Sequence, residues 1–316
     1  MNEIHDIGDI TNHYKVEGRF DDGGYGDLYI GSDLRSEKQV AIKTQKPWRI
    51  GAKSIYHSDG RRLVEEEGSH MITLSGIEAI PKLIAKGTYR TDRCLVMEFI
   101  KGRQLRTALE EEPPIKDPAT VASIIGQLCE IFRDVHEKNL VHCDLKPENV
   151  IVEPDGRLRL IDMGQAVRME TPTDDYRGTP GYASPEQLDA NPDGLTAGAD
   201  IFTLGAMLLE MTVMHLPYGG LERRVEIGHP VLPADLVAKI PAEFHDLALH
   251  MVQWNPEDRP KDVQEVFDRI RCHLPEKGSR RPRKPLRPDP TEYYRTRAPR
   301  LWHRLPRGTT SSQPFQ

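Results

Sequence analysis

The chain has 316 residues, of which 37% are hydrophobic and 29% are charged, a composition typical of a soluble globular protein with a sizeable core. The formal net charge is −6, but residues 277–316 carry 11 Lys and Arg against 2 Asp and Glu, so an acidic body precedes a basic tail. The most apolar stretch, residues 201–216, is shorter than the ~20 apolar residues of a spanning helix, which excludes a membrane segment there.

Residues 1–20 have no apolar core and therefore do not resemble a secretory signal. The four cysteines are too widely spaced to form a paired zinc motif. Isolated thiols without an export signal are typical of a reducing compartment. We therefore expect a cytoplasmic protein that makes no contact with a membrane.

Strand-like runs dominate the first hundred or so residues. Residues 28–30, 40–42 and 95–97 are short apolar runs between glycine-rich and charged turns. After Gly102 the periodicity is helical, because apolar residues from Val121 to Val135 repeat every three or four positions. Further helices are expected near 199–214 and 244–253. A strand-rich first part and a helix-rich second part predict two lobes with a cleft between them.

A glycine-rich loop, Gly23-Gly24-Tyr25-Gly26, lies between the first expected strands. Glycines allow backbone N–H groups to approach phosphate oxygens, although most such loops are ordinary turns. Lys43 ends the next strand, where burial of its ammonium would require an acidic partner. Glu67 lies on an expected helix and is a candidate for that partner. The alternative is that Lys43 is a surface charge.

The segment 141–150, Val-His-Cys-Asp-Leu-Lys-Pro-Glu-Asn-Val, places Asp144 and Asn149 on one expected loop. Asp162-Met163-Gly164 follows the next strand. Phosphoryl transfer needs an acceptor for the proton of the substrate hydroxyl, ligands for a metal ion, and cations near the phosphates. Asp144, Asn149 and Asp162, together with Lys43 and Lys146, supply these groups.

In this order and spacing the motifs resemble those of the eukaryotic-type protein kinases, which also occur in bacteria. The resemblance covers residues 12–275 and implies an α+β fold of two lobes, an N-lobe of about 12–98 and a C-lobe of about 102–275. Residues 1–11 would be an N-terminal extension. The implied reaction uses ATP and Mg²⁺ and phosphorylates protein substrates.

The resemblance also assigns a role to each matching residue. Asp144 would orient the substrate hydroxyl and accept its proton, and Asn149 and Asp162 would bind magnesium. Lys43, held by Glu67, would contact the α- and β-phosphates. The remaining implied nucleotide contacts are Gly23, Gly24 and Gly26 over the phosphates, and Leu28, Ala41, Met97, Glu98 and Ile100 around adenine.

Downstream residues agree with this assignment. Residues 178–186 resemble the end of a kinase activation segment, and Arg259 would form a structural pair with Glu186. Asp200 would anchor the catalytic loop. Lys146, which would contact the γ-phosphate, and Thr179, which would hydrogen-bond to Asp144 and Lys146, are typical of serine/threonine kinases.

The chain departs from the family pattern at four positions. Asp21 replaces the first loop glycine, Leu28 replaces a valine, and Met163 replaces the phenylalanine of the Asp-Phe-Gly motif. Cys143 replaces the arginine that pairs with a phosphorylated activation-segment residue, and a neutral thiol cannot form that bond. We expect Cys143 to serve packing, with a redox role as the alternative.

Two other functions are compatible with parts of this pattern. A pseudokinase scaffold would keep the fold and bind ATP without catalysis, and Asp21 is the residue that favours it. A small-molecule phosphotransferase would share the Asp144–Asn149–Asp162 arrangement. However, residues 178–186 resemble a peptide-binding ledge, which favours a protein substrate.

The tail, residues 276–316, combines many prolines and arginines with few aliphatic side chains, so we expect it to be disordered. Three roles remain open for it. It is a solvated tail without a partner, it docks acidic protein surfaces, including the acidic body itself, or it binds nucleic acid through arginines interleaved with aromatic residues.

Overall fold

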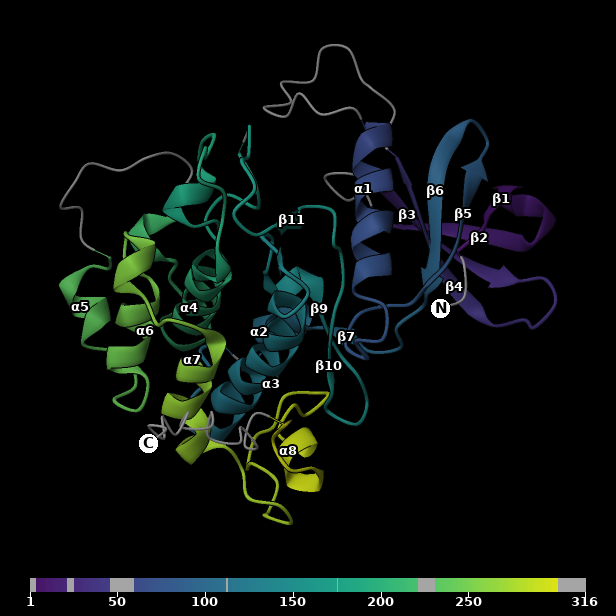
Figure 1. The fold of residues 1–316 in the computed structure, drawn as a ribbon. Coiled ribbons are helices and arrows are strands. Elements are labelled where there is room, and N and C mark those ends of the chain that lie inside the picture. The colour runs from purple at the N-terminus through teal and green to yellow at the C-terminus, as the bar shows by residue number, and fades with distance from the viewer. Residues whose placement is uncertain are drawn as a thin grey trace, which may run out of the picture.

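The computed structural model describes residues 4–21, 26–45, 60–111, 113–174, 176–220 and 231–300. It has two lobes, as the sequence predicts (Figure 1). A six-stranded sheet and the helix α1 form most of the N-lobe, and a bundle of helices with a three-stranded sheet and one further pair of short strands forms the C-lobe. No helix within the described ranges is long and apolar enough to cross a membrane.

The N-lobe sheet has the strand order β1-β5-β6-β4-β3-β2, and all pairs are antiparallel except β1–β5. Residues 6–9 of the expected N-terminal extension thus form an edge strand of this sheet. The strands expected around residues 28–30, 40–42 and 95–97 are confirmed within β3, β4 and β6. The strands are β1 (Asp6–Asp9), β2 (Tyr14–Asp21), β3 (Gly26–Asp33), β4 (Gln39–Gln45), β5 (Leu83–Tyr89) and β6 (Asp92–Glu98).

The two faces of this sheet have different partners because side chains alternate along a strand. Val40 and Ile42 of β4 belong to a small core on one face. Ala41 packs against the large core, which is centred on the C-lobe helices. Lys43 shares the parity of Ala41, so the strand directs the ammonium toward α1 and the cleft side of the sheet.

Helix α1 (Gly60–Thr73) lies beside the sheet on the side nearer the C-lobe (Figure 1). Its described residues bury Val64, Glu67 and Met71, which recur at three- and four-residue spacing, and Leu74 just beyond the helix is buried as well. A carboxylate therefore lies in the middle of an apolar helix face. This position is costly unless a cation faces it.

The C-lobe is built around two long helices. In α4 almost every side chain is buried, which agrees with its largely apolar sequence. The helices expected at 121–135, 199–214 and 244–253 are confirmed as α3, α4 and α6. The helices are α2 (Leu105–Glu111), α3 (Pro118–His136), α4 (Ala197–Val213), α5 (Ala234–Val237), α6 (His245–Met251) and α7 (Val263–Ile270).

The remaining strands and the 3₁₀ helices are short, and all but η1, which lies between β1 and β2, belong to the C-lobe. The strands form a three-stranded sheet of order β10-β9-β7 and the pair β11–β8. They are β7 (Arg103–Gln104), β8 (Leu140–Val141), β9 (Val150–Val152), β10 (Leu158–Leu160) and β11 (Val167–Arg168). The 3₁₀ helices are η1 (Ile10–Asn12), η2 (Pro147–Asn149), η3 (Pro185–Gln187), η4 (Pro217–Gly219), η5 (Pro256–Asp258) and η6 (Arg271–His273).

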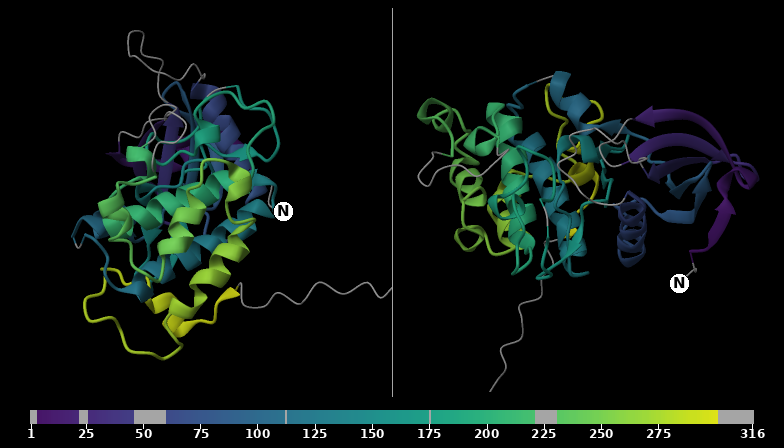
Figure 2. Two further views of the ribbon diagram at one scale, coloured as in Figure 1. Left: turned by 90° about the vertical axis from the view of Figure 1, so that its left-hand side faces the viewer. Right: turned by 90° about the horizontal axis from the view of Figure 1, so that it is seen from above.

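The expectation that the tail is disordered is wrong for residues 276–300. This stretch, which we call the C-terminal segment, ends in helix α8 (Glu292–Thr296) and lies against the C-lobe below α3 (Figures 1 and 2). Leu286 and Tyr294 are buried, and only 1% of Tyr294 is exposed. Residues 301–316 lie outside the described part of the chain.

Polar groups and small residues on α3 explain why this segment is ordered. The buried carboxylate of Glu130 accepts hydrogen bonds from the hydroxyls of Tyr293 and Tyr294, at 3.0 and 3.2 Å. A side chain at Gly126 would collide with the Tyr294 hydroxyl, 2.9 Å from the position of a Cβ. Two tyrosines and a buried acid thus replace the aliphatic contacts whose scarcity suggested disorder.

We expect Tyr294→Ala to lower the free energy of unfolding by about 3 kcal/mol or more, the cost of deleting a buried aromatic ring. The change also leaves the Glu130 carboxylate with one donor fewer. Urea unfolding followed by circular dichroism measures the effect. Arg283→Ala, an exposed substitution in the same segment, is the control and should leave the unfolding curve unchanged. Equal curves for the two variants would contradict the docking of this segment.

Candidate active site

Lys43 connects the two lobes at the centre of the site. Its Nζ lies 2.8 Å from Oε2 of Glu67 on α1 and 2.7 Å from Oδ1 of Asp162, which follows β10 in the C-lobe. Only 8% of Lys43 is exposed. The pairing of Lys43 with Glu67, predicted from the sequence, is confirmed, and the alternative of a surface charge is excluded.

Burial opposes the charged form of all three groups, but their neighbours shift the three pKa values in different ways. Burial would lower the pKa of Lys43, but Asp162 and Glu67 together raise it, so the ammonium stays charged. Burial likewise opposes ionisation of Asp162, yet the adjacent ammonium lowers the pKa of Asp162 to about 2. Burial raises the pKa of Glu67 to about 7, because Lys43 offsets the desolvation only in part and Asp162 adds repulsion.

A buried acidic side chain, that of Asp200, holds the loop that carries Asp144. Asp200 in the first turn of α4 is 0% exposed and accepts the backbone N–H groups of His142 and Cys143, at 2.9 and 3.0 Å. Its Oδ2 also lies 2.9 Å from Nε2 of His136. Cys143 has a φ of 66°, a left-handed conformation that is strained for a residue with a side chain. The anchoring role expected for Asp200 is thus visible as hydrogen bonds.

Above this anchor, Asp144, Lys146 and Thr179 form one hydrogen-bonded group. The Lys146 ammonium donates to Oγ1 of Thr179 at 2.7 Å, and Thr179 donates to Oδ1 of Asp144 at 2.5 Å. Lys146 Nζ lies 3.4 Å from Oδ2 of Asp144. Burial raises the pKa of Asp144, with Lys146 and the Thr179 hydroxyl acting against it. The predicted contacts of Thr179 are confirmed.

The two candidate metal ligands flank the β9–β10 hairpin. Asn149 immediately precedes β9 and Asp162 follows β10, and the Ile161 N–H donates to the Asn149 carbonyl at 2.8 Å. The Asn149 amide nitrogen donates to the Asp144 backbone carbonyl and to its Oδ2, at 2.7 and 3.1 Å. The Asn149 amide oxygen is therefore the atom suited to a cation.

These ligands fit magnesium. The Asp162 carboxylate is ionised, and about a third of its side chain, 31%, is exposed. No cluster of three or more His, Cys, Asp or Glu side chains suited to a metal occurs in the described ranges. Mg²⁺ does not need one, because it keeps several waters and is held by one or two protein oxygens together with substrate phosphates.

Three of the residues expected around adenine, Leu28, Ala41 and Met97, share the cleft side of the sheet. Leu28 is the cross-strand neighbour of Lys43, and Ala41 is that of Met97. Glu98 ends β6, and Ile100 follows outside any regular element. Gly26 begins β3, whereas Gly23 and Gly24 lie outside the described residues. Asp21 ends β2, and its side chain is outside the description as well.

The end of the activation segment is tied to the C-lobe core. Arg259 donates to both carboxylate oxygens of Glu186, at 2.6 and 2.8 Å, which confirms the predicted pair. The sequence analysis did not identify Gln187 as a site residue. Its amide nitrogen donates to the Cys143 carbonyl at 2.7 Å and so joins this segment to the loop that carries Asp144. Ser184 and Gln187 form a capping box at the start of η3. The Ser-x-x-Gln spacing in the sequence is typical of such a box and could have indicated that Gln187 has a structural role.

A second group that the sequence analysis did not identify lies next to the loop that carries Asp144. Arg106 of α2 donates to Glu148 and to Glu210, each at 2.7 Å, and to the Tyr182 hydroxyl at 2.5 Å. Tyr182 in turn donates to Glu210 at 2.6 Å. Each residue type is common on a surface, so no local pattern in the sequence indicates the cluster.

Cys143 and Met163 are both about 1% exposed. Cys143 packs with Val141, Leu195 and Ala199, and burial raises the pKa of its thiol well above the usual value. A buried, protonated thiol is unreactive, which supports the packing interpretation over the redox one. Met163 belongs to the large core and fills the position of the usual phenylalanine.

The comparison with known families agrees with this geometry. Residues 14–269 match the model of the protein kinase domain, which is most of the chain, and the chain therefore belongs to the protein kinase family.

Several known proteins are similar to it. The serine/threonine-protein kinase PknL of Mycobacterium tuberculosis is 28% identical over 266 residues, which cover 80% of this chain and 64% of PknL. The serine/threonine-protein kinase pkn2 of Myxococcus xanthus is 30% identical over 193 residues, covering 56% of this chain and 22% of that protein. Human rhodopsin kinase GRK1 is 30% identical over 196 residues, covering 58% and 34%. The chain thus spans less than two thirds of the length of these relatives.

The raised pKa of Glu67 makes stability depend on pH. The folded protein binds a proton at this carboxyl more tightly than the unfolded chain, so the stabilisation is complete below pH 4.5 and is lost as the pH rises through about 7. We expect Glu67→Gln, which cannot titrate, to remove a decline of at most about 3 kcal/mol over this range. Urea unfolding of both proteins from pH 4.5 to 7 measures the difference. Equal declines would assign the dependence to other groups.

Proposed function

We propose that this chain is a serine/threonine protein kinase that transfers the γ-phosphate of ATP to serine or threonine hydroxyls of protein substrates, itself included. The observation that carries the proposal is the hydrogen-bonded group of Asp144, Thr179 and Lys146, which lies beside Asn149. Asp144 also interacts electrostatically with Asp162, which is paired with Lys43. Together these residues combine a proton acceptor, a phosphate-facing cation and oxygen ligands within one small volume.

Asp144 acts on the substrate hydroxyl. Its carboxylate is buried, and hydrogen bonds from Thr179 and Asn149 hold both oxygens in place. Burial raises its pKa, which makes it a better proton acceptor than an exposed aspartate. Lys146, next to the same carboxylate, neutralises charge on the phosphoryl group during transfer.

Lys43 and Asp162 act on the phosphates and the metal. Lys43 is held in place by Glu67, and its ammonium contacts the α- and β-phosphates. Asn149 and Asp162 would hold Mg²⁺, which would supply positive charge to the phosphate oxygens. The close Lys43–Asp162 contact places the ammonium and the metal ligand next to each other, as this division of work requires.

The adenine would lie against Leu28, Ala41 and Met97 and contact the backbone between the lobes, which we call the hinge (residues 98–100). The Glu98 N–H already donates to the Lys82 carbonyl at 2.9 Å, so a contact at Glu98 would use its carbonyl and one at Ile100 its N–H. Gly23, Gly24 and Gly26 would cover the phosphates.

The proposed partners are ATP, Mg²⁺ and protein substrates, and the proposed location is the cytoplasm. Lys146 and Thr179, which touch each other and Asp144, favour serine and threonine over tyrosine as acceptors.

We expect Asp144→Asn to lower kcat by about 100- to 10,000-fold, because the variant lacks the proton acceptor. The change removes charge and little volume, so binding of ADP should persist. The measurement is transfer of label from γ-labelled ATP, in Mg²⁺, to serine or threonine of a generic basic protein and of the kinase itself. Arg283→Ala is the matched control. Wild-type protein that binds nucleotide but transfers no label would refute the proposed activity and favour a pseudokinase.

We expect activity to be nearly independent of phosphorylation at Thr171, Thr173 and Tyr176. The residue before Asp144 is Cys143, a buried neutral thiol that offers no charge to a phosphate group. Phosphatase-treated enzyme should keep most of its rate, as should the double variant Thr171→Ala/Thr173→Ala. Loss of nearly all activity in either experiment would contradict this prediction and would indicate that another cation binds the phosphate group.

A further inference from the structure

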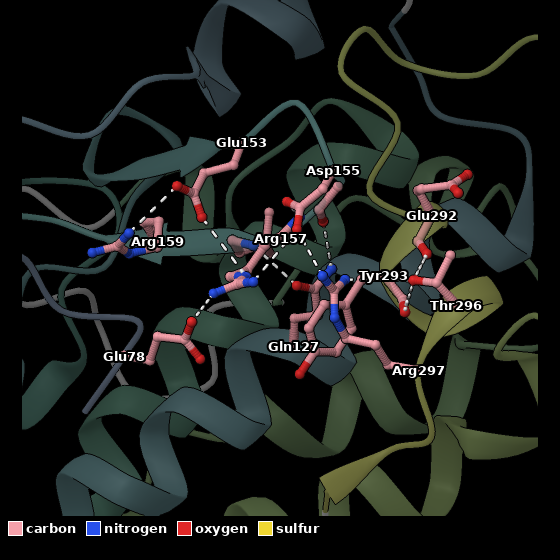
Figure 3. A network of polar contacts seen from close by, with 12 residues as sticks. Glu78, Gln127, Glu153, Asp155, Arg157, Arg159, Glu292, Tyr293, Thr296 and Arg297 are labelled. Atoms are coloured by element: carbon pink, nitrogen blue, oxygen red, sulfur yellow. Dashed lines mark hydrogen bonds and ion pairs between the residues drawn. The ribbon is translucent and has the colours of Figure 1, made fainter. Parts of the chain in front are cut away.

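A continuous row of alternating charges runs from the C-terminal segment to the hinge. Each member lies within salt-bridge distance of the next, and no two like charges are adjacent. Figure 3 shows the part of the row between the C-terminal segment and the hairpin. Its members, which we call the charge chain, are Arg297, Asp155, Arg157, Glu153, Arg159 and Glu98.

The first half of the charge chain holds the C-terminal segment to the β9–β10 hairpin. Arg297 Nη2 lies 2.7 Å from Asp155 Oδ2, and its guanidinium stacks over the ring of Tyr293 at 5.2 Å. Asp155 lies 3.5 Å from Arg157, whose Nε is 3.8 Å from Glu153. All three hairpin residues lie in the turn between β9 and β10 (Figure 3).

The second half runs from the hairpin to the hinge. Arg159 on β10 lies 3.4 Å from Glu153, and its Nη2 is 2.9 Å from Oε2 of Glu98, the last residue of β6. The same Glu98 oxygen accepts the Lys82 backbone N–H at 3.2 Å. With 7% of its side chain exposed, Arg159 is the most buried member of the chain, so its charge is the least screened by solvent.

The C-terminal segment also supports this hairpin directly. A Cβ at Gly156 would lie 2.3 Å from the Asp289 carbonyl oxygen, so only glycine allows the segment to approach so closely. Gln127 of α3 donates to the carbonyls of both Gly156 and Pro290, at 3.0 and 3.2 Å, and so joins the two backbones. The hairpin turn is therefore held on one side by α3 and on the other by the segment.

We propose that the C-terminal segment positions the hinge for the nucleotide through the charge chain, with Arg297 and Arg159 as positioning residues. Arg159 fixes the carboxylate of Glu98, and thereby the backbone of residue 98 that the proposed function assigns to adenine. Arg157 also pairs with Glu78, so it has three acidic neighbours. Loss of Arg297 leaves Arg157 as the remaining partner of Asp155 in the charge chain. Arg157 then shifts toward Asp155 and away from Glu153, and Glu153 competes more strongly with Glu98 for Arg159. The inference rests on the proposed function because the nucleotide is what the hinge holds.

We expect Arg297→Ala to raise both the KM for ATP and the Kd for ADP by about threefold to tenfold while kcat is retained. Arg297→Lys, which keeps the charge, should restore part of the affinity. Arg283→Ala, in the same segment but outside the charge chain, should match the wild type. An unchanged KM, or a fall in kcat with KM unchanged, would overturn the proposal. Circular dichroism melts identify any general loss of structure.

A double-mutant cycle separates transmission through the charge chain from an independent loss of stability. Glu98→Gln cuts the chain at the hinge, so Arg297→Ala should add little to the KM for ATP in that background. Effects that multiply would mean that the two ends act independently and would overturn the proposal.

The failure of this inference is distinguishable from failure of the proposed function. The Kd for ADP is measured by calorimetry without any phosphoryl transfer, so a protein that binds nucleotide but is inactive still tests the charge chain. A wild-type protein that neither binds ADP nor transfers label would instead refute the proposed function, and the inference with it.

Discussion

The arrangement of the site depends on one buried carboxylate. Asp200 lies in the interior of the C-lobe without any exposure, and it accepts two backbone N–H groups from the loop that carries Asp144. A buried acidic side chain in such a place is stable only while its hydrogen-bond donors remain, so the loop and the helix constrain each other. The strained backbone of Cys143 is one result, and the direction of Asp144 is another.

The charges above this anchor join the lobes. Lys43 comes from the sheet, Glu67 from α1 and Asp162 from the C-lobe. A carboxylate oxygen of each of the two acids lies within 2.8 Å of the Lys43 ammonium. The pKa of Asp162 is lowered and that of Glu67 is raised, so Asp162 carries the larger negative charge of the two. The Lys43 ammonium is therefore attracted more strongly to Asp162, across the cleft, than to Glu67. The sheet of the N-lobe is therefore held to the C-lobe as well as to its own helix.

The sequence was sufficient to predict the lobes, the main strands and helices, and the pairs Lys43–Glu67 and Glu186–Arg259. These predictions succeeded because the motifs have short, fixed spacings and because apolar periodicity marks the buried faces. The Arg106 cluster and the partners of Glu130 could not be predicted. Their members are individually ordinary charged residues or tyrosines, and only the fold brings them together from distant positions. The order of the C-terminal segment was missed for the same reason.

The residues of α3 that the C-terminal segment covers are unusual for the middle of an apolar helix. The family match ends at residue 269, yet Gly126, Gln127 and Glu130 on α3 have partners that lie beyond it. A chain without such a covering would gain nothing from a glycine and a carboxylate in the middle of this apolar helix, and it would bear the cost of both. A small residue at position 126 together with an acid at position 130 is therefore the pattern we expect in relatives whose α3 is covered by such a segment, and we expect it to be absent from relatives without one.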